Sequence, residues 1–549
     1  MKHPHFSRRY FLGATAATGL AAIAAACGPS GAPGPAVEGD SQGEPDAPST
    51  QGSSGAPPRN RSAEELVLAA PRDLANGLED PYFTHLIVNA WNSLSKLDND
   101  LVPQPELAES WESSDDARVW IIKLRPGITF HDGGEFDAGA VAANIERYVK
   151  ISPRSSRFFG YSKERALGQF EKVEAVDANT VRLTLGEPRP ALPNTMSNFY
   201  SAMFSPASFN AEGSFNEPPA STGPFKIIEW EKGQHLILEA FEGYHLGAPA
   251  VKQIILRSLP DPNTRVAALR SGEIDGVVDL GGLQPQQGAQ LREDSALVVN
   301  SKPIALFQYL SFNCRKPPFD KPEMRQAVNM AIDRQSLADD LWHGFATAGK
   351  SILPSFATTW ARQDLVPEYN PQKALELAQA ALGGQRMKIT APISSLQNNR
   401  YPYKSLFEVI QAVIAPLGLD AELQLIEHAA WKEVVANGDY NLTVSTFGWA
   451  NGDPDYIFSR FMHSQGNTNA TRHFDYNDPE VDSLIEQAAV ALDYNERRAL
   501  YDQLQEIAFN DVRFAALLYD HVVYAHHPEV KGYDVSALYQ PTLAKLSVG

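Results

Sequence analysis

The chain has very few cysteines, which excludes several kinds of site. Only Cys27 and Cys314 occur among 549 residues. A zinc framework built on paired cysteines therefore cannot form, and we expect no metal site. Cys314 lies in the apolar run LFQYLSFNC. We expect it to be a buried small side chain rather than a nucleophile.

Positive charge is also scarce. The chain has 47 Lys and Arg against 66 Asp and Glu, for a formal net charge of −19. Proteins that bind nucleic acid rely on clustered basic residues. The sequence also has no GxxxxGK[ST] phosphate loop, and no GxGxxG after a strand pattern. We therefore expect no nucleic-acid partner and no cofactor.

No long run of strongly apolar residues occurs near the N-terminus. The stretch from Tyr10 to Ala26 is mostly Ala, Gly and Thr, and falls short of the roughly 20 apolar residues of a spanning helix. Because Arg8 and Arg9 precede it, we interpret it as an export signal. The letters SRRYFL resemble the twin-arginine export motif. A general secretory signal that happens to hold two arginines is the alternative.

Cys27 ends this stretch, and AAAC resembles a bacterial lipobox, although Ala24 stands where Leu is usual. Residues 28–62 are rich in Gly, Pro and Ser, so they cannot bury a core and should be disordered. The pattern predicts a protein lipid-anchored at Cys27 to the outer face of a bacterial membrane, in the periplasm or at the cell surface. Lipidation of Cys27 would leave Cys314 without a disulfide partner.

The rest of the chain shows strand and helix patterns. Three hairpins are predicted, around Pro126–Gly127, Ala178–Asn179 and Lys232–Gly233. Asp137 is a candidate N-cap. A later helix should begin after Asn370 at Pro371 and end at Gly383.

The second half alternates helices and strands, which predicts an α/β fold with a sheet covered by helices. The loop FGWANGDPDY, Phe447–Tyr456, falls just past the carboxyl end of a predicted strand. Open α/β sheets bind their ligands at that edge.

Several blocks of sequence, in a specific order, resemble a known family. They read LRPGITFHDGGEFDAGAVAANIER, TGPFKIIEWEKGQHLILEAFEGYH, DPNTRVAALRSGEIDGV, FDKPEMRQAVNMAIDRQSLADDLWHG, LPS and YNDPEVDSLIEQA. The chain is identified by these blocks as similar to the extracytoplasmic solute-binding proteins, family 5, of bacterial ABC importers. The family includes dipeptide-, oligopeptide- and nickel-binding proteins.

The resemblance implies an α/β, periplasmic-binding-protein-like (type II) fold with hinged lobes and an additional inserted domain. It implies hinged closure on a small-molecule or peptide ligand, which an ABC permease in the cytoplasmic membrane would then receive. We expect a monomer. The expected divisions are an export signal with lipobox (1–27), a linker (28–62), lobe I (64–99, 220–300 and 517–549), inserted lobe II (100–219) and lobe III (301–516).

The resemblance also suggests ligand-binding residues. In the family's peptide binders, an acid in the loop that here begins with Gly448 and Trp449 holds the ligand's ammonium group. Here the loop is shorter; Asp453 is the candidate, with Asp455 beside it. Turning and capping of the loop by these aspartates is the alternative.

At the carboxylate end, the resemblance suggests Arg400, although Tyr401 separates it from Pro402–Tyr403. Arginine can grip a carboxylate with two hydrogen bonds. A solvated loop arginine is the alternative. Trp449, Tyr401 and Trp431 are candidate aromatic walls; Trp431 could equally belong to the core.

The expected function is therefore capture of a di- or oligopeptide, without catalysis. The same fold could instead bind an oligosaccharide or a metal chelate. A secreted hydrolase that uses Asp453 and Asp455 as paired carboxylates is an alternative of a different class. Their spacing on one loop argues against it, and no GxSxG elbow occurs.

The lipobox leads to a prediction about anchoring. Cys27→Ala, expressed in a bacterial host that lipidates exported proteins, should move the protein to the aqueous phase of a detergent partition. The thiol is the only attachment point that the pattern offers for acyl chains. Cys314→Ala is the matched control and should stay with the detergent. Unchanged membrane association of Cys27→Ala would exclude lipidation at this position.

Overall fold

The computed structural model describes residues 64–72, 74, 89–151, 170–197 and 201–549. All of them belong to one compact unit, residues 55–549. The export signal, Cys27 and the 28–62 linker lie outside the described residues. Within the described ranges, no helix has the length and apolar character needed to cross a membrane.

The largest sheet has nine strands and combines segments from distant parts of the sequence. The parallel pairs are β1 with β10 and β1 with β11; the other neighbours are antiparallel. In spatial order the strands are β16 (Leu442–Gly448), β12 (Val298–Phe312), β17 (Phe514–His526), β11 (Gly276–Val277), β1 (Glu65–Ala70), β10 (Gln253–Ser258), β9 (His235–Ala240) and β8 (Phe225–Glu231), with β13 (Ala346–Ala348) on β17.

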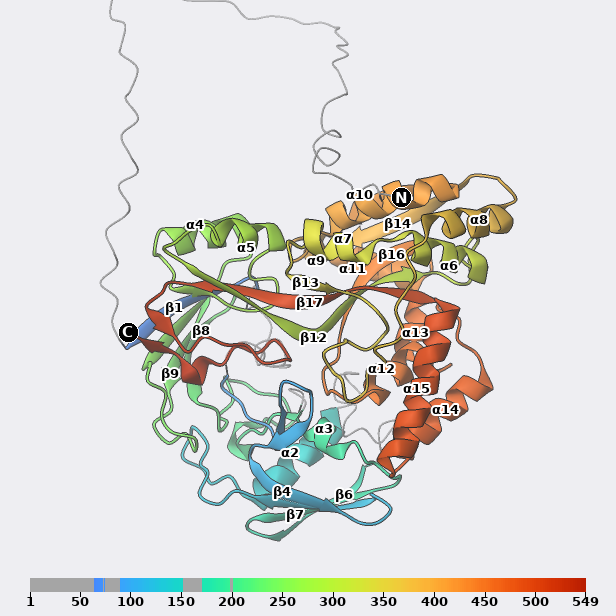
Figure 1. Ribbon diagram of the computed structural model, residues 1–549. Helices are drawn as coiled ribbons and strands as arrows, with labels where there is room; N and C mark the ends of the chain where they lie inside the picture. The colour runs from blue at the N-terminus through green and yellow to red at the C-terminus, as the bar shows by residue number, and fades with distance from the viewer. Residues whose placement is uncertain (1–63, 73, 75–88, 152–169, 198–200) are drawn as a thin grey trace, which may run out of the picture. The chain divides into compact units, whose positions relative to one another are not determined.

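Strands β12 and β17 cross the middle of this unit side by side (Figure 1). Their register runs from Val298 opposite His526 to Ser311 opposite Phe514, with shifts between Pro303 and Phe307 and at Gln308. One end of each strand lies in the sequence range expected for lobe I and the other in that of lobe III. These two ranges are therefore joined by continuous, hydrogen-bonded strands.

Helices cover both ends of the large sheet (Figure 1). Helices α4 and α5 lie over the β1 end, whereas the others belong to the lobe III range, together with the parallel pair β14–β15. The elements are α4 (Pro262–Arg270), α5 (Pro285–Leu291), α6 (Pro322–Ala331), α7 (Arg334–Ser336), η5 (Leu337–Leu341), α8 (Pro371–Leu382), β14 (Met387–Ser394), α9 (Ser395–Asn398), α10 (Tyr403–Ile414), η6 (Ala415–Leu417), β15 (Leu419–Ile426), α11 (His428–Ala436), α12 (Asp455–Phe461), α13 (Asn467–Arg472), α14 (Pro479–Val490) and α15 (Tyr494–Asp511).

The range expected for lobe II has its own sheet, in the order β4-β5-β7-β6, with α2 against it. Its buried residues, including Trp120, Ile145 and Leu183, form a separate apolar cluster. The elements here and in the remaining segments are β2 (Ser95–Leu97), β3 (Pro103–Pro105), β4 (Ala108–Ser113), β5 (Val119–Leu124), α2 (Ala138–Ile151), β6 (Phe170–Asp177), β7 (Thr180–Leu185), α3 (Leu192–Met196), η4 (Pro206–Ser208), β18 (Val530–Lys531), η7 (Leu543–Lys545) and β19 (Ser547–Val548).

Local helix signals agree with the structure. Helix α8 begins at Pro371, where the Asn370 side chain accepts a hydrogen bond from the Lys373 amide at 3.0 Å. It ends before Gly383, which has a left-handed φ of 60°. The Asp137 carboxylate likewise accepts from the Ala140 amide at 2.8 Å at the start of α2. Both predicted caps are confirmed.

Two of the three predicted hairpins are confirmed, β6–β7 and β8–β9. The one around Pro126–Gly127 is wrong: β5 pairs with β4 and β7, and Thr129 forms a bridge with Glu135 instead. Cys314 is buried as predicted, and burial raises the pKa of its thiol to about 12.

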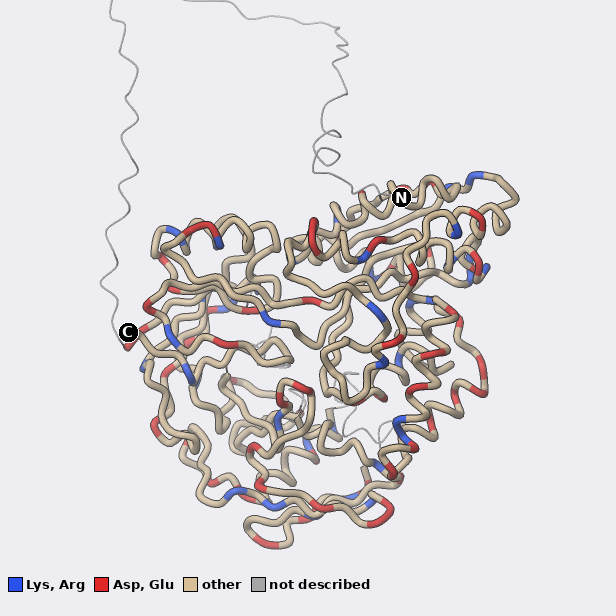
Figure 2. The backbone as a smooth tube through the Cα atoms, in the orientation of Figure 1, with Lys and Arg blue, Asp and Glu red and all other residues tan. Residues whose placement is uncertain are grey.

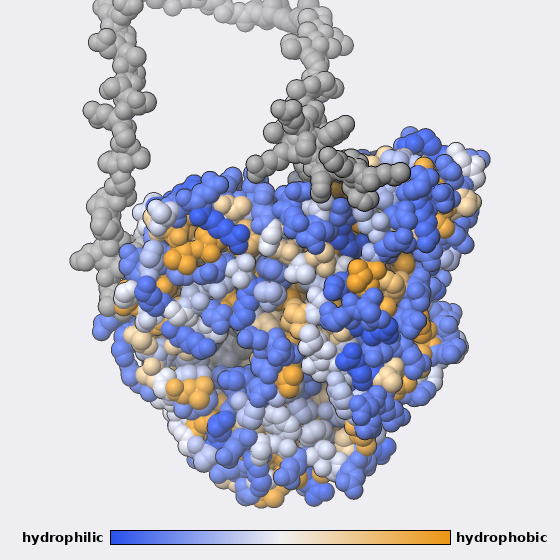
Figure 3. All heavy atoms as spheres, in the orientation of Figure 1, coloured by the Kyte–Doolittle hydropathy of each residue, from blue (hydrophilic) through white to orange (hydrophobic). Residues whose placement is uncertain are grey.

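Charges of both signs are spread along the described chain, with Lys and Arg interspersed among Asp and Glu (Figure 2). Hydrophilic side chains predominate on the face shown in Figure 3, with apolar residues in small groups.

Candidate functional site

Asp453, the predicted ammonium-binding acid, is buried and already paired. Two nitrogens of the Arg497 guanidinium, on α15, each donate to a different oxygen of its carboxylate at 2.8 Å. The two side chains are only 6% and 3% exposed. The Trp449 indole N–H donates to the Asp453 carbonyl oxygen at 2.6 Å. The ammonium role of Asp453 stays a prediction, and these contacts count against it.

Asp455 is the first residue of α12 and is also buried. Burial raises the pKa of its carboxyl group to about 6, while the charge of Arg189 acts to lower it. Arg189 comes from the lobe II range, and the Nε–H of this buried residue has no acceptor in the part of the chain that the structure describes. Nearby, the Asn194 amide donates to the Asn451 carbonyl at 2.8 Å. The DPD loop therefore contacts the lobe II range.

Both predicted tryptophan walls lie in apolar clusters. Trp449 is fully buried in a cluster that contains Phe458 and Phe461. Trp431 is 2% exposed, and its ring stacks on His428 at a centroid distance of 5.8 Å. These contacts match the core alternative for Trp431. A ligand contact by either ring stays untested.

Arg400 and Tyr401 lie in the link between α9 and α10, at a second place in the fold. Burial, and next the charge of Arg72, lower the pKa of the Arg400 guanidinium. Arg72 itself donates two hydrogen bonds to Asp279, one of them 2.8 Å long. The Arg400 guanidinium makes no hydrogen bond or ion pair with the described residues. We call Arg72, Asp279 and Arg400 the arginine site.

A glycine loop positions Arg400. A Cβ at Gly281 would lie 2.8 Å from the Cβ of Arg400, and Gly281 has a φ of +70°. Arg265 fixes this loop by donating to the Gly282 carbonyl at 2.8 Å and to the Gly281 carbonyl at 3.2 Å. Gln284 reaches across to the Asn399 carbonyl at 3.1 Å. The lobe I loop therefore packs directly against the backbone that carries Arg400.

Tyr401 and Gly448 lie near this arginine site. Tyr401 is 6% exposed and stacks on Tyr403 with ring centroids 5.4 Å apart. A Cβ at Gly448 would lie 3.2 Å from the Tyr539 hydroxyl. Burial is the main cause of the raised pKa of Tyr401. Tyr539 raises this pKa further, whereas the charge of Arg400 acts to lower it. Of the seven predicted ligand residues, the structure thus gathers Arg400, Tyr401 and Gly448 in one region.

Sequence reasoning missed Arg72 and Asp279, although a signal for them exists. Arg72 follows the end of β1 by two residues, and Asp279 follows the end of β11 by two. These strands are parallel neighbours, so their carboxyl ends lie at the same edge of the sheet. The short strand β11 was too weak a pattern to reveal this pairing.

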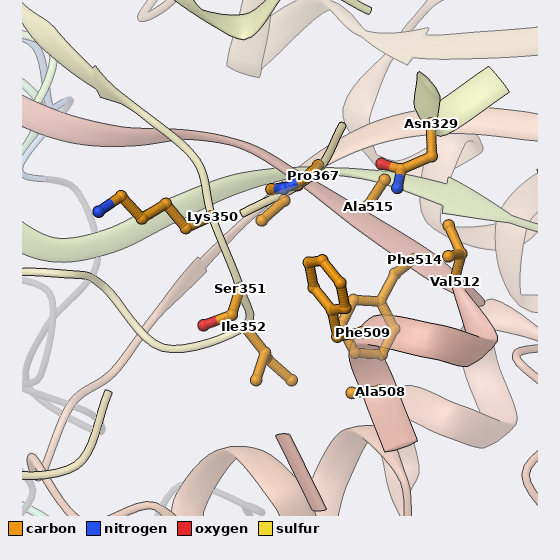
Figure 4. Close-up of a pocket in the computed structure, with 11 residues that line it drawn as sticks. Asn329, Lys350, Ser351, Ile352, Pro367, Ala508, Phe509, Val512, Phe514 and Ala515 are labelled. Carbon is orange, nitrogen blue, oxygen red and sulfur yellow. The ribbon is translucent and has the colours of Figure 1, made fainter. Parts of the chain in front are cut away.

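Other candidate sites in the described chain are less suitable. A cavity of about 20 Å³ lies beside Ser351 and Phe514 (Figure 4); it could hold about one water molecule. Glu229, Glu231 and His235 could supply metal ligands. However, the His235 ring already makes a partly exposed 2.8 Å hydrogen bond with Glu229, which accounts for the closeness of these side chains.

The geometry described so far, a helix-covered sheet with a charged site between two ranges of one chain, is typical of a solute-binding protein. The family model for bacterial extracellular solute-binding proteins, family 5 (middle region), matches residues 102–469. The chain belongs to this family, and its relatives are binding proteins rather than enzymes.

Two curated relatives illustrate the similarity. The glutathione-binding protein GsiB of Escherichia coli O1:K1 is 29% identical over 489 residues, which cover 86% of this chain and 92% of that relative. Heme-binding protein A of Haemophilus influenzae is 30% identical over 461 residues, covering 78% and 81%.

Solved structures agree on the fold. NikA from Brucella suis, in complex with Fe(III)-EDTA, superposes with a TM-score of 0.78 and 22% identity over 88% of this chain and all of that one. DppA from Helicobacter pylori, an ABC transporter-associated periplasmic binding protein in complex with the peptide STSA, gives 0.71 and 26% identity over 88% and 98%. The fold is therefore the α/β type II periplasmic-binding-protein fold.

The Asp453–Arg497 pair leads to a stability prediction. Asp453→Asn should lower the free energy of unfolding by about 3–5 kcal/mol, because it leaves the buried Arg497 charge without a counter-charge. Urea unfolding at neutral pH measures this change. The exposed acid Asp115, replaced by Asn, is the control and should change stability by less than about 0.5 kcal/mol. A similarly small loss for Asp453→Asn would contradict a structural role.

For Asp455 we expect the opposite effect, that removing the carboxyl group stabilises the fold at neutral pH. The native pKa of about 6 exceeds the ordinary value of 3.8, so between those pH values the folded protein holds a proton that the unfolded chain releases. Stability contributed by this group therefore falls as pH rises from about 4 to 6. Asp455→Asn removes that fall. The stability of Asp455→Asn relative to wild type should therefore rise by up to about 3 kcal/mol between pH 4 and pH 7. A pH-independent difference would contradict the assignment.

Proposed function

We propose that this chain is the substrate-binding lipoprotein of an ABC importer, and that it captures a small peptide and delivers it to a permease in the cytoplasmic membrane. Export through the twin-arginine signal and a lipid at Cys27 would hold the monomeric protein outside that membrane. The linker 28–62 would separate the anchor from the binding unit.

The observation that carries this proposal is the unpaired guanidinium of Arg400. The Arg400 side chain is partly buried, and withdrawing a charge from water without giving it a partner is unfavourable. The Asp279 carboxylate is already hydrogen-bonded to Arg72, and Arg265 contributes a third positive charge near that carboxylate. Among the described residues, the site thus has more positive than negative charge. A ligand carboxylate would supply the missing acceptor with two parallel hydrogen bonds.

The relatives support a peptide as the cargo. The glutathione-binding protein of Escherichia coli is similar to this chain over most of its length. So is DppA of Helicobacter pylori, which was crystallised with the peptide STSA. The hydrolase alternative gains no support from the geometry, because both carboxylate oxygens of Asp453 bond to Arg497.

Strands β12 and β17 are suited to act as the hinge of the proposed closure. They are continuous between the lobe I and lobe III ranges, and their register shifts near Pro303 and Gln308. Contacts such as Gln284 with Asn399 join the two ranges beside Arg400. Ligand binding would favour the closed arrangement by adding contacts that exist only there.

Removing the arginine charge tests the proposal. Arg400→Gln should weaken binding of reduced glutathione and of Ser-Thr-Ser-Ala by roughly 10- to 100-fold, the usual effect of losing a charge-assisted hydrogen bond. The same change should have little effect on the C-terminally amidated tetrapeptide, which already lacks the carboxylate. Calorimetric titration and thermal shift both measure these affinities.

Arg386, which pairs with Asp420 at the surface of the same range, supplies the matched control, and Arg386→Gln should bind the probes as wild type does. Equal loss for free and amidated peptides in Arg400→Gln would contradict the carboxylate role. Failure of wild type to bind any peptide, with binding of an oligosaccharide or metal chelate, would overturn the peptide proposal.

A further inference from the structure

A second polar cluster lies in the middle of the two crossing strands. Gln308 of β12 and Asp520 of β17 are 0% and 1% exposed. The Gln308 amide nitrogen donates to one carboxyl oxygen of Asp520 at 2.5 Å. The Tyr401 hydroxyl interacts with the Asp520 carboxyl group, and Tyr403, whose hydroxyl interacts with Thr446, also lies beside it. We call these four residues the acid pocket.

Two buried oxygens of the acid pocket, the second carboxyl oxygen of Asp520 and the amide oxygen of Gln308, have no hydrogen-bond partner among the described residues. Buried polar groups are nearly always hydrogen-bonded. Asp520 also forms no ion pair within the described residues. Burial therefore raises the pKa of its carboxyl group well above the ordinary value. Two unpartnered acceptor oxygens in one place indicate a missing hydrogen-bond donor.

The chemistry of these atoms specifies what that partner must be. The carboxyl and amide oxygens can only accept hydrogen bonds when Asp520 is ionised, and the hydroxyls can accept as well as donate. A primary ammonium group supplies three N–H donors and the positive charge that a buried carboxylate lacks. A water molecule supplies two donors and no charge.

The acid pocket adjoins the arginine site through one residue. The raised pKa of Tyr401 responds, after its burial, to the negative charge of Asp520 and to the positive charge of Arg400. An unpaired cation and an unpaired acid therefore both lie close to the same tyrosine. A small zwitterion would satisfy the two together.

We infer that the acid pocket binds a primary ammonium group of the ligand, with Asp520 as its counter-ion, while Arg400 holds the carboxylate. This inference rests on the proposed function and assigns the ammonium role to Asp520 rather than to Asp453. Asp453 has its own cation in Arg497, whereas Asp520 has none among the described residues.

The test compares free and N-acetylated forms of Ser-Thr-Ser-Ala by calorimetric titration on the full-length protein. Asp520→Asn keeps the side-chain shape and removes the charge, so it should weaken the free peptide more than about 100-fold. The N-acetylated peptide should bind wild type weakly, and Asp520→Asn should change that binding little. Glu106→Gln alters another buried acid, whose pKa burial raises to about 7, and should affect neither peptide.

Tyr401→Phe provides a second variant if Asp520→Asn does not fold. It keeps the ring stacked on Tyr403 and removes one hydroxyl, so it should weaken the free peptide roughly tenfold and leave the acetylated peptide unchanged. Two results would overturn the ammonium assignment while leaving peptide binding intact. One is equal binding of free and acetylated peptide by wild type, and the other is unchanged affinity for the free peptide in both variants. Absence of any peptide binding by wild type would overturn the proposed function itself.

Discussion

The pairing of β12 with β17 is the constraint on which the rest of the binding unit depends. Strands β16, β11 and β13 all hydrogen-bond to one of these two strands. Through them, the loop that carries Asp279 and the loop that follows Gly448 acquire their positions. Gln308 and Asp520 lie on the two strands themselves. A sheet shared between two ranges of the chain thus fixes both charged ends of the region, while its register shifts interrupt the regular ladder near the middle.

Buried charge is handled in two different ways in this protein. At the DPD loop, Asp453 and Arg497 satisfy each other with two hydrogen bonds, as a buried pair must to offset its desolvation. In the region of Arg400 and Asp520, a partly buried guanidinium and one oxygen of a buried acid have no partner among the described residues. Natural proteins rarely leave such groups unsatisfied for stability alone. We propose that this contrast, rather than the presence of acidic residues, distinguishes the structural cluster at Asp453 from the ligand site.

Local signals in the sequence were sufficient for much of the fold. The cap at Asn370, the stop at Gly383 and the buried Cys314 depend on near neighbours, and the alternation of helices and strands located the loop after β16. The hairpin at Pro126–Gly127 failed because a turn signal does not decide which strand pairs with which. Partner choice for side chains is longer in range still: Arg497 lies 44 residues from Asp453, and Asp279 lies 207 from Arg72. A pattern on one loop cannot reveal a counter-ion on a distant helix.

The close approach at Gly281 has a consequence for how related sequences could diverge. Only the absence of a side chain lets that loop touch the backbone of Arg400, and its φ of +70° also favours glycine. Any larger residue would act as a spacer that moves the guanidinium away from Asp279. If the arginine site holds the ligand carboxylate as proposed, a substitution at Gly281 alone would therefore change the space beside Arg400 without altering any group proposed to contact the ligand.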